Sequence, residues 1–367
     1  MRILDVVGAR PNFMKVAPVH AALLRHGHDA KLIHTGQHYD ANMSDVFFTE
    51  LGMPRPDRSL NVGSGTHAVQ TARILEAFEA VLLEERPELV LVAGDVNSTL
   101  ACALAATKLH VRVAHLEAGL RSDDRRMPEE INRIVTDHIA DVLLTPSADG
   151  DANLRREGIA ESKIFRVGNA MIDSLLQHLE RARATDALGR LGLKRRGYAL
   201  TTLHRPENVD SPEILRALLG ALVELAREVP VVFPAHPRTR KQIHDAGMEQ
   251  LVEGASGLRI VEPLGYLEFL ALEADAALVL SDSGGVQEET TALGVPCLTL
   301  RENTERPITV SEGTNTMVGS DLQAIRSGVA EILAGRGKRG RVPENWDGRA
   351  AERIAADLYR WLQAGAR

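Results

Sequence analysis

Carboxylates and arginines are interleaved in one short stretch of the chain, residues 115–133, which reads HLEAGLRSDDRRMPEEINR. Such a stretch is either a solvated loop whose charges neutralise one another or a source of acid and base groups. The dipole of a helix beginning near Pro128 explains acidic residues at its start, Glu129 and Glu130, without any chemistry. It does not explain Glu117, which directly follows an apolar run that we expect to be a buried strand. Glu117 is therefore a candidate for acid/base chemistry.

Three other polar side chains follow predicted strands in the same way. Asp95 lies in GDVNST, where the alternative to chemistry is a role as a helix cap or turn residue. His204 lies in LHRPEN and His236 lies in PAHPR, each beside an arginine. A single histidine at a strand end is more often structural, but two in matching positions favour a functional role.

The segment LSDSGGVQEET, residues 280–290, has the composition of a phosphate-binding turn. Ser283, Gly284 and Gly285 would present a hydroxyl and consecutive backbone N–H groups to a phosphate at the start of a helix. A plain capped helix is the alternative. Glu289, one turn into that helix, could accept hydrogen bonds from both hydroxyls of a ribose.

Cations accompany this turn from two other segments. Arg301 and Arg306 in RENTERP would supply positive charge for a pyrophosphate. In GARPNFMK, Gly8 permits a tight turn, and Arg10 and Lys15 could reach an anion at the start of the following helix. An ordinary strand-to-helix turn with surface cations would have the same composition. Taken together, the segments predict a site for a nucleotide diphosphate.

Short apolar runs alternate with amphipathic stretches along the whole chain. Near-continuous apolar runs are typical of parallel strands covered by helices on both faces, so the predicted fold class is α/β with doubly wound sheets. The expected strands are residues 3–7, 31–35, 89–93, 111–116, 141–145 and 163–167, followed by 198–202, 229–234, 257–261, 276–281 and 296–300.

The two series of strands predict two domains, residues 1–168 and 169–348. The charged helical stretch at 175–197 separates the two series and indicates a boundary helix plus linker. The last stretch predicts an amphipathic helix over 349–367, with Trp346 and Trp361 available as anchors. In open α/β sheets ligands bind outside the carboxyl ends of the strands, which is where the polar segments fall.

The composition excludes several classes of function. The 367 residues are 44% hydrophobic and 25% charged with a net charge of −7, which does not favour nucleic-acid or membrane binding. We find no membrane span and no signal-peptide pattern, and Cys102 and Cys297 in apolar segments indicate buried free thiols, so we expect a cytoplasmic protein. There is no GxGxxG, no P-loop and no metal-ligand cluster, and we expect neither a metal nor another cofactor.

Eight blocks, in order, resemble the non-hydrolysing UDP-N-acetylglucosamine 2-epimerases: GARPNFMKVAP, GQHYD, GDVNST, HLEAGLRS, MPEEINR, LHRPEN, DSGGVQEE and ERPITVSEGT. The resemblance covers the chain from Met1 to about Gly319. It implies a GT-B fold, with two Rossmann-like domains facing a central cleft, UDP held mainly by the second domain, and the final helix returning to the first. It also implies a homodimer.

The resemblance assigns roles residue by residue. The catalytic acids fall on Asp95, Glu117 and Glu129, and the catalytic histidine falls on His204. The UDP contacts fall on Arg10, Lys15, His236, Ser283, Gly284, Gly285, Glu289 and Arg306. The implied reaction is C2 epimerisation of UDP-GlcNAc to UDP-ManNAc, by elimination of UDP to a 2-acetamidoglucal and re-addition.

Other functions remain open at the level of the sequence. The block GQHYDANMSDVFF resembles archaeal members and the related epimerases that act on UDP-2,3-diacetamido-glucuronic acid. A GT-B glycosyltransferase would share the nucleotide site but would need an acceptor. A hydrolysing epimerase would release free N-acetylmannosamine and UDP. A catalytically silent nucleotide-sugar binding protein would have no use for the acidic positions.

Overall fold

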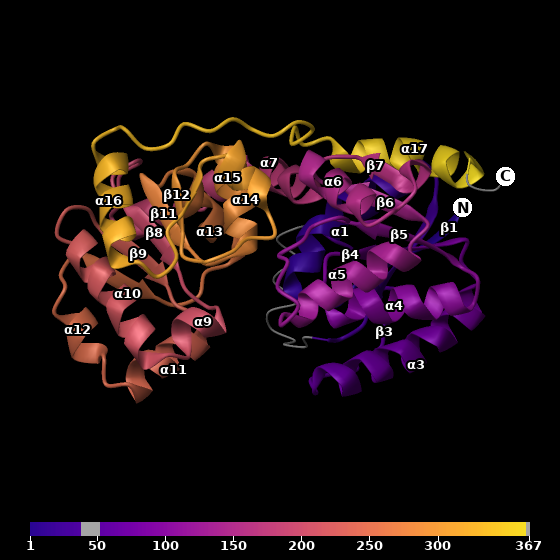
Figure 1. Ribbon diagram of the computed structural model, residues 1–367, viewed down its shortest axis with the longest axis horizontal. Helices are drawn as coiled ribbons and strands as arrows, with labels where there is room; N and C mark the ends of the chain where they lie inside the picture. Colours follow the sequence, from indigo (N-terminus) through magenta and orange to yellow (C-terminus); the bar gives the residue numbers. More distant parts are fainter. Residues whose placement is uncertain (38–51, 365–367) are drawn as a thin grey trace. The chain divides into compact units, whose positions relative to one another are not determined.

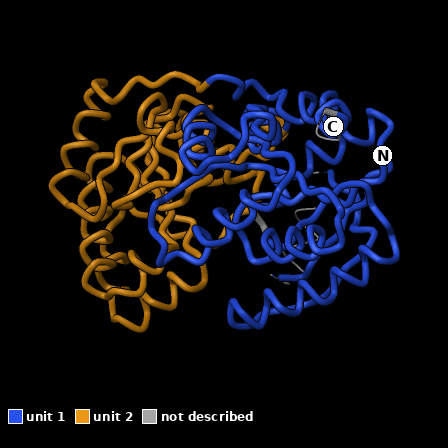
Figure 2. Tube along the Cα trace, turned by 45° about the vertical axis from the view of Figure 1, so that its right-hand side comes forward, with its two compact units in different colours: residues 1–177, 344–367 blue, residues 178–343 orange. Residues whose placement is uncertain are grey.

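The computed structural model describes residues 1–37 and 52–364, apart from the side chains of residues 10, 11 and 364. Figure 1 shows the helices and strands along the chain. The chain forms two compact units, coloured separately in Figure 2. Unit 1 contains residues 1–177 and 344–367, and unit 2 contains residues 178–343.

Unit 1 is built on a parallel sheet in the order β3-β2-β1-β4-β5-β6-β7. Its strands are β1 (Arg2–Val7), β2 (Asp29–His34), β3 (Arg58–Ser59), β4 (Leu89–Ala93), β5 (Arg112–Leu116), β6 (Val142–Thr145) and β7 (Ile164–Arg166). Its helices are α1 (Arg10–Arg25), α3 (His67–Glu85), α4 (Asn97–Lys108), α5 (Pro128–Ile139), α6 (Ala148–Arg156), the short 3₁₀ helix η1 (Glu161–Lys163), most of α7 (Ala170–Arg183) and α17 (Ala350–Ala364).

Unit 2 repeats the design with a parallel sheet in the order β10-β9-β8-β11-β12-β13. Its strands are β8 (Ala199–Thr202), β9 (Val231–Pro234), β10 (Leu258–Val261), β11 (Leu278–Ser281), β12 (Cys297–Thr299) and β13 (Asn315–Met317). Its helices are α8 (Ala187–Arg190), α9 (Pro206–Val209), α10 (Pro212–Leu225), α11 (Pro237–Asp245), α12 (Glu249–Glu253), α13 (Tyr266–Ala274), α14 (Gly284–Leu293), α15 (Pro307–Ser311) and α16 (Leu322–Leu333).

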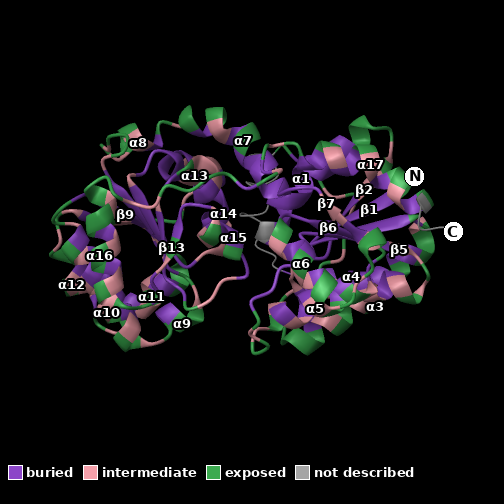
Figure 3. Ribbon diagram, turned by 45° about the horizontal axis from the view of Figure 1, so that its top comes forward, coloured by how far each residue is buried: buried purple, intermediate pink, exposed green. Residues whose placement is uncertain are grey.

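The order of strands reverses once in each sheet, and each reversal fixes where a ligand is expected. In unit 1 the neighbours at the reversal are β1 and β4, and in unit 2 they are β8 and β11. At such a point the loops leave the sheet in opposite directions and open a crevice at the carboxyl ends of the strands. Figure 3 shows the strands buried while the helices around them carry exposed faces.

The eleven strands expected from the sequence are confirmed, with ends that shift by no more than two residues. The sequence reading missed β3 and β13. β3 has two residues, and β13 reads NTM, with Asn315 turned inward to donate hydrogen bonds to the carbonyl of Gln287 (2.9 Å) and the hydroxyl of Thr291 (3.0 Å). Neither strand has the β-branched apolar pattern by which strands are recognised.

The compact units divide at 177/178 and 343/344, whereas the sequence reading places the divisions at 168/169 and 348/349. The start of α7 packs on unit 1, because the Ser174 hydroxyl donates to the carbonyl of Met14 at 2.6 Å. The returning segment packs there as well, since the Trp346 indole N–H donates to the carbonyl of Pro146 at 2.9 Å. Local sequence does not carry these long-range contacts.

The final helix is fixed to unit 1 at both of its ends. The Asp173 carboxylate accepts the N–H groups of Ala350 (3.1 Å) and Ala351 (2.7 Å) and so caps the start of α17. Burial raises the pKa of Asp173 to about 6, although these two N–H groups oppose the shift. Trp361 stacks on Phe165 with ring centroids 4.3 Å apart. The expected helix and its aromatic anchors are confirmed.

Candidate active site

The loops after β4 and β5 bring a buried ion pair to the carboxyl end of the unit 1 sheet. The Lys15 ammonium, on α1, pairs with the carboxylate of Glu117, which follows β5 and is 8% exposed. Gly94, which follows β4, lies against this pair. A Cβ atom at Gly94 would be 3.2 Å from Lys15 Nζ and 3.3 Å from Glu117 Oε2, at a φ of +68°. The site therefore requires glycine at position 94.

Glu117 has an unusual backbone conformation. Its φ is +73°, a left-handed value that costs a non-glycine residue about 1–3 kcal/mol. The N–H groups of Glu117 and Ala118 both donate to the carbonyl of Leu144, at 3.0 and 3.2 Å, which holds the loop in this conformation. Strain of this kind is concentrated at functional sites, where the surrounding structure enforces it. The backbone thus supports the candidate role of Glu117.

A buried histidine–aspartate pair lies behind this loop. The His115 ring is fully buried, with Nδ1 2.6 Å from Asp137 Oδ1 and Nε2 2.8 Å from the carbonyl oxygen of Gly94. Both neighbours are hydrogen-bond acceptors, so both ring nitrogens donate. The second oxygen of Asp137 accepts the N–H of Gly119 at 3.1 Å. His115 and Asp137 therefore tie the loop after β4 to the loop after β5.

The charge of Asp137 is set by its surroundings. Burial would raise the pKa of Asp137, but His115 and Arg121 together hold it below its usual value. Arg121 donates to Asp137 at 2.7 Å and, on its other side, to both oxygens of Glu157 at 2.7 and 2.8 Å. The carboxylate therefore stays ionised inside the domain, where an unpaired charge would be very costly.

Asp95 is held by α5. Its carboxylate pairs with the guanidinium of Arg133. Arg133 also donates two hydrogen bonds to Glu130 Oε2, from Nε at 2.9 Å and from Nη2 at 2.7 Å. Glu130 is 1% exposed and also accepts the backbone N–H groups of Ser122 (3.0 Å) and Asp123 (2.9 Å). Burial works to raise the pKa of Glu130, but these N–H groups and Arg133 lower it. Glu130 therefore organises the loop and orients the partner of Asp95.

The two adjacent glutamates of α5 differ sharply. The sequence reading interprets Glu130 as a dipole or ion-pair residue, and the ion pair with Arg133 is confirmed. Its burial was not foreseen. Glu129, in contrast, is half-buried, and among the described residues no hydrogen bond or ion pair engages its carboxylate. Glu129 is therefore available to a ligand.

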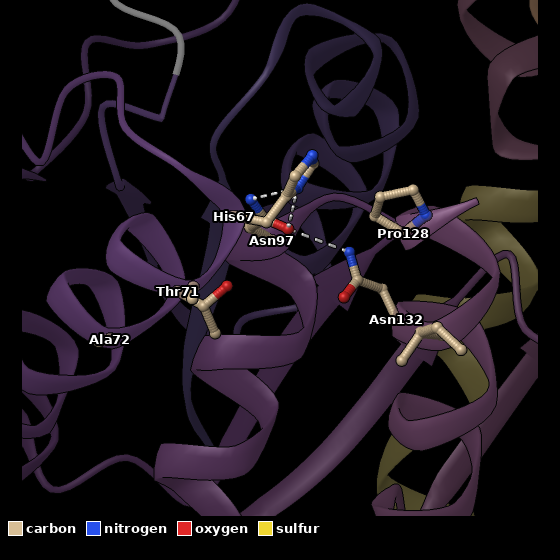
Figure 4. Close-up of a pocket in the computed structure, with 8 residues that line it drawn as sticks. His67, Thr71, Ala72, Asn97, Pro128 and Asn132 are labelled. Atoms are coloured by element: carbon tan, nitrogen blue, oxygen red, sulfur yellow. Dashed lines mark hydrogen bonds between the residues drawn. The ribbon is translucent and has the colours of Figure 1, made fainter. Parts of the chain in front are cut away.

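A shallow cavity of about 420 Å³ opens beside the Asp95 loop. It lies at the N-terminal ends of α3, α4 and α5, as Figure 4 shows. Asn132 donates to the carbonyl of Asp95 at 2.8 Å and to the side chain of Asn97 at 3.3 Å, which in turn contacts the His67 ring. Its lining residues are His67, Ala68, Thr71, Ala72, Asn97, Pro128, Ile131 and Asn132. Asn97, from GDVNST, and Pro128, Ile131 and Asn132, from MPEEINR, lie in blocks singled out from the sequence, whereas the four residues from α3 do not.

In unit 2, His204 follows β8 and lies at the reversal point of the sheet. Its side chain is 48% exposed, and its Nδ1 is 2.8 Å from Oδ1 of Asp282, which is fully buried. Asp282 directly follows β11, the neighbour of β8. The sequence reading assigned no role to Asp282, although it stands beside Ser283 in the same motif.

The start of α14 is shaped around an arginine. Ser283 is its N-cap residue, and a Cβ atom at Gly284 would lie 2.6 Å from Arg306 Nη1. The glycine therefore allows the Arg306 guanidinium to approach the first turn of the helix. Arg306 Nε is 2.9 Å from Glu288, and its Nη1 pairs with Glu305. The predicted association of Arg306 with this helix start is thus seen, within a buried network of carboxylates.

Glu305 collects three arginines. Burial would raise the pKa of Glu305, but Arg306, Arg301 and Arg205 hold it well below its usual value. Arg301 donates at 2.7 Å, and Arg205 approaches to 3.6 Å. Three guanidinium groups and the carboxylates of Glu305 and Glu288 thus form one charged network near the start of α14.

The remaining predicted residues of unit 2 also follow its strands. Glu289 is 7% exposed and accepts the Tyr266 hydroxyl at 3.4 Å. Burial and the charge of Glu289 raise the pKa of Glu273 well above its usual value. His236 is the N-cap of α11, and its Nδ1 accepts the N–H of Arg238 at 3.2 Å, which leaves the proton of a neutral ring on Nε2.

Two predicted segments cannot be placed fully. Arg10 is the first residue of α1, but its side chain lies outside the described residues, as does the GQHYD block from residue 38 onward. No group of three histidine, cysteine or carboxylate side chains within residues 1–37 and 52–364 is arranged to hold a metal ion. In the same residues we find no helix with the length and apolar content needed to cross a membrane.

Two Rossmann-like domains with parallel sheets define the GT-B class of folds, and comparisons with known proteins agree. The sequence profile of the UDP-N-acetylglucosamine 2-epimerases matches residues 21–359. The chain is 45% identical to the UDP-N-acetylglucosamine 2-epimerase of Methanocaldococcus jannaschii, over 98% of this chain and 99% of that protein. It therefore belongs to the UDP-N-acetylglucosamine 2-epimerase family.

Two further relatives bear on the site. A crystal structure of the M. jannaschii UDP-GlcNAc 2-epimerase, in complex with UDP-GlcNAc and UDP, superimposes with a TM-score of 0.90 at 44% identity, covering 98% of this chain and 100% of that one. The UDP-2,3-diacetamido-2,3-dideoxy-D-glucuronate 2-epimerase of Pseudomonas aeruginosa is 47% identical, over 87% of this chain and 89% of that protein.

The contrast between the adjacent glutamates of α5 gives a stability prediction. Replacing Glu130 by Gln removes the buried negative charge that faces Arg133 and should lower the free energy of unfolding by about 3 kcal/mol. This value is at the lower end for buried pairs because Asp95 still neutralises Arg133. The matched variant Glu129→Gln should change it by no more than about 0.5 kcal/mol. Urea unfolding of both variants measures the difference, and equal losses would contradict the assignment.

Proposed function

We propose that this protein epimerises UDP-GlcNAc and UDP-ManNAc at C2 without net hydrolysis. The observation that carries the proposal is the buried Glu117 carboxylate, held in a left-handed backbone conformation against Lys15 at the carboxyl end of the sheet. Among the described non-glycine residues with a positive φ, Glu117 alone is buried. Membership of the family, and the UDP-GlcNAc bound in the M. jannaschii structure, identify the chemistry that this carboxylate would serve.

The proposed reaction proceeds by elimination and re-addition. The C1–O bond to UDP breaks and its electron pair leaves with UDP, while a base takes the proton from C2 and the C1=C2 double bond of a 2-acetamidoglucal forms. Re-addition of UDP and return of a proton to the opposite face of C2 give the epimer. Positive charge develops at C1 as UDP departs, and carboxylates stabilise that charge.

Proton transfer at two opposite faces requires more than one acid/base group. We propose that Asp95, Glu117, Glu129 and His204 form this set. The carboxylates of Asp95 and Glu117 contact Arg133 and Lys15, and they suit a role as base or charge stabiliser. The half-buried Glu129 and half-exposed His204 have room to reach a substrate.

We propose that UDP remains bound through the intermediate at the start of α14. The N-cap Ser283 and the backbone N–H groups of Gly284 and Gly285 suit a phosphate, supported by the Arg306 guanidinium beside Gly284. Glu289 suits the ribose hydroxyls. Arg10, Lys15 and His236 complete the proposed set of UDP contacts, and no metal or other cofactor is required.

The second candidate substrate is UDP-2,3-diacetamido-glucuronic acid. It is favoured by the 47% identity to the P. aeruginosa enzyme that is named for this sugar. A glycosyltransferase reaction is the more distant alternative, because it has no need of three acidic side chains.

Incubation with each nucleotide sugar alone, in deuterated water, tests the reaction and the substrate. With UDP-GlcNAc and no acceptor, NMR should show UDP-ManNAc carrying deuterium at C2, because the proton removed there exchanges with solvent. Conversion of the diacetamido-glucuronate nucleotide alone would select the second candidate. Free N-acetylmannosamine would indicate hydrolysis, and an unlabelled epimer would argue for a different route.

Replacing Glu117 by Gln tests the central residue of the proposal. The substitution keeps the size of the side chain but removes the charge that faces Lys15, so kcat should fall by at least about a hundredfold while affinity for UDP, measured calorimetrically, changes little. Asp95→Asn should behave in the same way. Near-normal turnover in both variants would refute the catalytic assignment.

We also propose a cytoplasmic homodimer. The two cysteines are buried free thiols, as suits a reducing compartment, and Val69 and Leu83 on α3 expose apolar surface that a second copy could cover. Sedimentation equilibrium should give twice the 39.9 kDa mass of one chain. A mass of 39.9 kDa at micromolar concentration would exclude a stable dimer.

A further inference from the structure

Asp282 is surrounded by hydrogen-bond donors from the loop after β8. Its Oδ2 accepts the backbone N–H groups of His204 and Arg205, both at 3.0 Å, and the Asn208 amide at 3.1 Å. Its Oδ1 faces His204 Nδ1 at 2.8 Å. Burial would raise the pKa of Asp282, but these groups, led by His204, hold it below its usual value. Asp282 is therefore a buried carboxylate with donors on both oxygens.

This arrangement selects one tautomer of His204. A carboxylate can only accept hydrogen bonds, so His204 Nδ1 must carry a proton and donate it to Oδ1. In the neutral ring the lone pair is then on Nε2. The His204 side chain is 48% exposed while Asp282 is fully buried. Asp282 therefore contacts the ring from its buried side, and Nε2 is left for a ligand.

We propose that Asp282 is a positioning residue of the epimerase reaction, which keeps Nε2 of His204 unprotonated and correctly oriented to exchange a proton with the substrate. The inference rests on the proposed function, because it gives His204 a reaction in which to serve. Asp282 is the first residue of the DSGG motif and directly precedes Ser283, where the proposed phosphate-binding turn begins.

A purely structural role for Asp282 is the competing interpretation, since its carboxylate also fixes the backbone of the loop after β8. The loop backbone is held mainly through Oδ2, and the N–H of His204 also lies 3.2 Å from Oδ1. The N–H groups of Arg205 and Asn208 donate to Oδ2, whereas the His204 ring faces Oδ1. A substitution that keeps an acceptor at the Oδ2 position but places a donor at the Oδ1 position therefore separates the structural role from the positioning role.

Asp282→Asn makes this separation. Its amide oxygen should take the Oδ2 position, where backbone and side-chain N–H groups converge, and its NH₂ should then face His204 Nδ1. Nδ1 would have to accept, and the proton of the neutral ring would move to Nε2. We expect kcat to fall by about a hundredfold to ten-thousandfold, with KM and UDP affinity little changed.

The tautomer is measured independently of turnover. Two-bond ¹H–¹⁵N correlation spectra of the ¹⁵N-histidine-labelled full chain, recorded at alkaline pH and assigned with His204→Asn, should show protonated Nδ1 in the parent and protonated Nε2 in Asp282→Asn. An unchanged tautomer, or a reversed tautomer with unchanged kcat, would overturn the proposal.

The chain offers a matched control at another histidine–aspartate pair, which is buried. His20 Nδ1 is 2.7 Å from Asp5 Oδ2, on α1 and β1, and neither residue belongs to the proposed machinery. Asp5→Asn should lower stability without reversing the His204 tautomer or lowering kcat at a temperature where the protein is folded. A similar loss of kcat in Asp5→Asn would assign the effect of Asp282→Asn to general destabilisation. That result would contradict the positioning role.

The outcomes also distinguish this inference from the proposed function. If the parent protein epimerises no nucleotide sugar, the proposed function fails whatever the spectra show. If the parent is active and His204→Asn abolishes turnover, but Asp282→Asn keeps both kcat and the parent tautomer, only the inference about Asp282 fails.

Discussion

The unit 1 site depends on the buried ion pairs that the Asp137 carboxylate makes with His115 and Arg121. Asp137 faces His115 and Arg121 and accepts the N–H of Gly119, so one side chain joins β5, the loop that follows it and α5. Through His115 the same network reaches the carbonyl of Gly94. Removal of the Asp137 charge would break its ion pairs with His115 and Arg121 in the interior, where the cost is several kcal/mol. The loop of Glu117 is therefore rigid before any substrate arrives.

Unit 2 follows the same physical rule with other residues. Asp282 gathers the N–H groups of the loop after β8, and Glu305 gathers the arginines near α14. In each case a buried carboxylate organises a loop at the carboxyl end of a sheet. Preorganisation of this kind matters for a reaction that develops charge at C1, because groups already in place need not reorganise during the reaction.

The sequence allows much of this to be predicted, and the limits have a physical origin. Strands are recognised because apolar runs are local, and Glu117 is recognised because no local effect explains a carboxylate there. The pairing of Lys15 with Glu117 joins residues 102 positions apart and depends on the sheet order. Asp137 and Glu130 carry no local signal, since an acidic residue on a charged amphipathic helix is ordinary until its burial is known. The boundaries of the compact units differ from those expected because they depend on long-range contacts, such as those of Ser174 and Trp346.

The path of the chain through the two units has a consequence for biosynthesis. Unit 2 is one continuous segment, residues 178–343, whereas unit 1 is assembled from both ends of the chain. On the ribosome, unit 2 can complete its fold while unit 1 still lacks Trp346 and α17, which cover its surface at Pro146 and Phe165. Unit 1 is thus finished last, and truncated chains that lack these residues would leave an intact unit 2 attached to an incomplete unit 1.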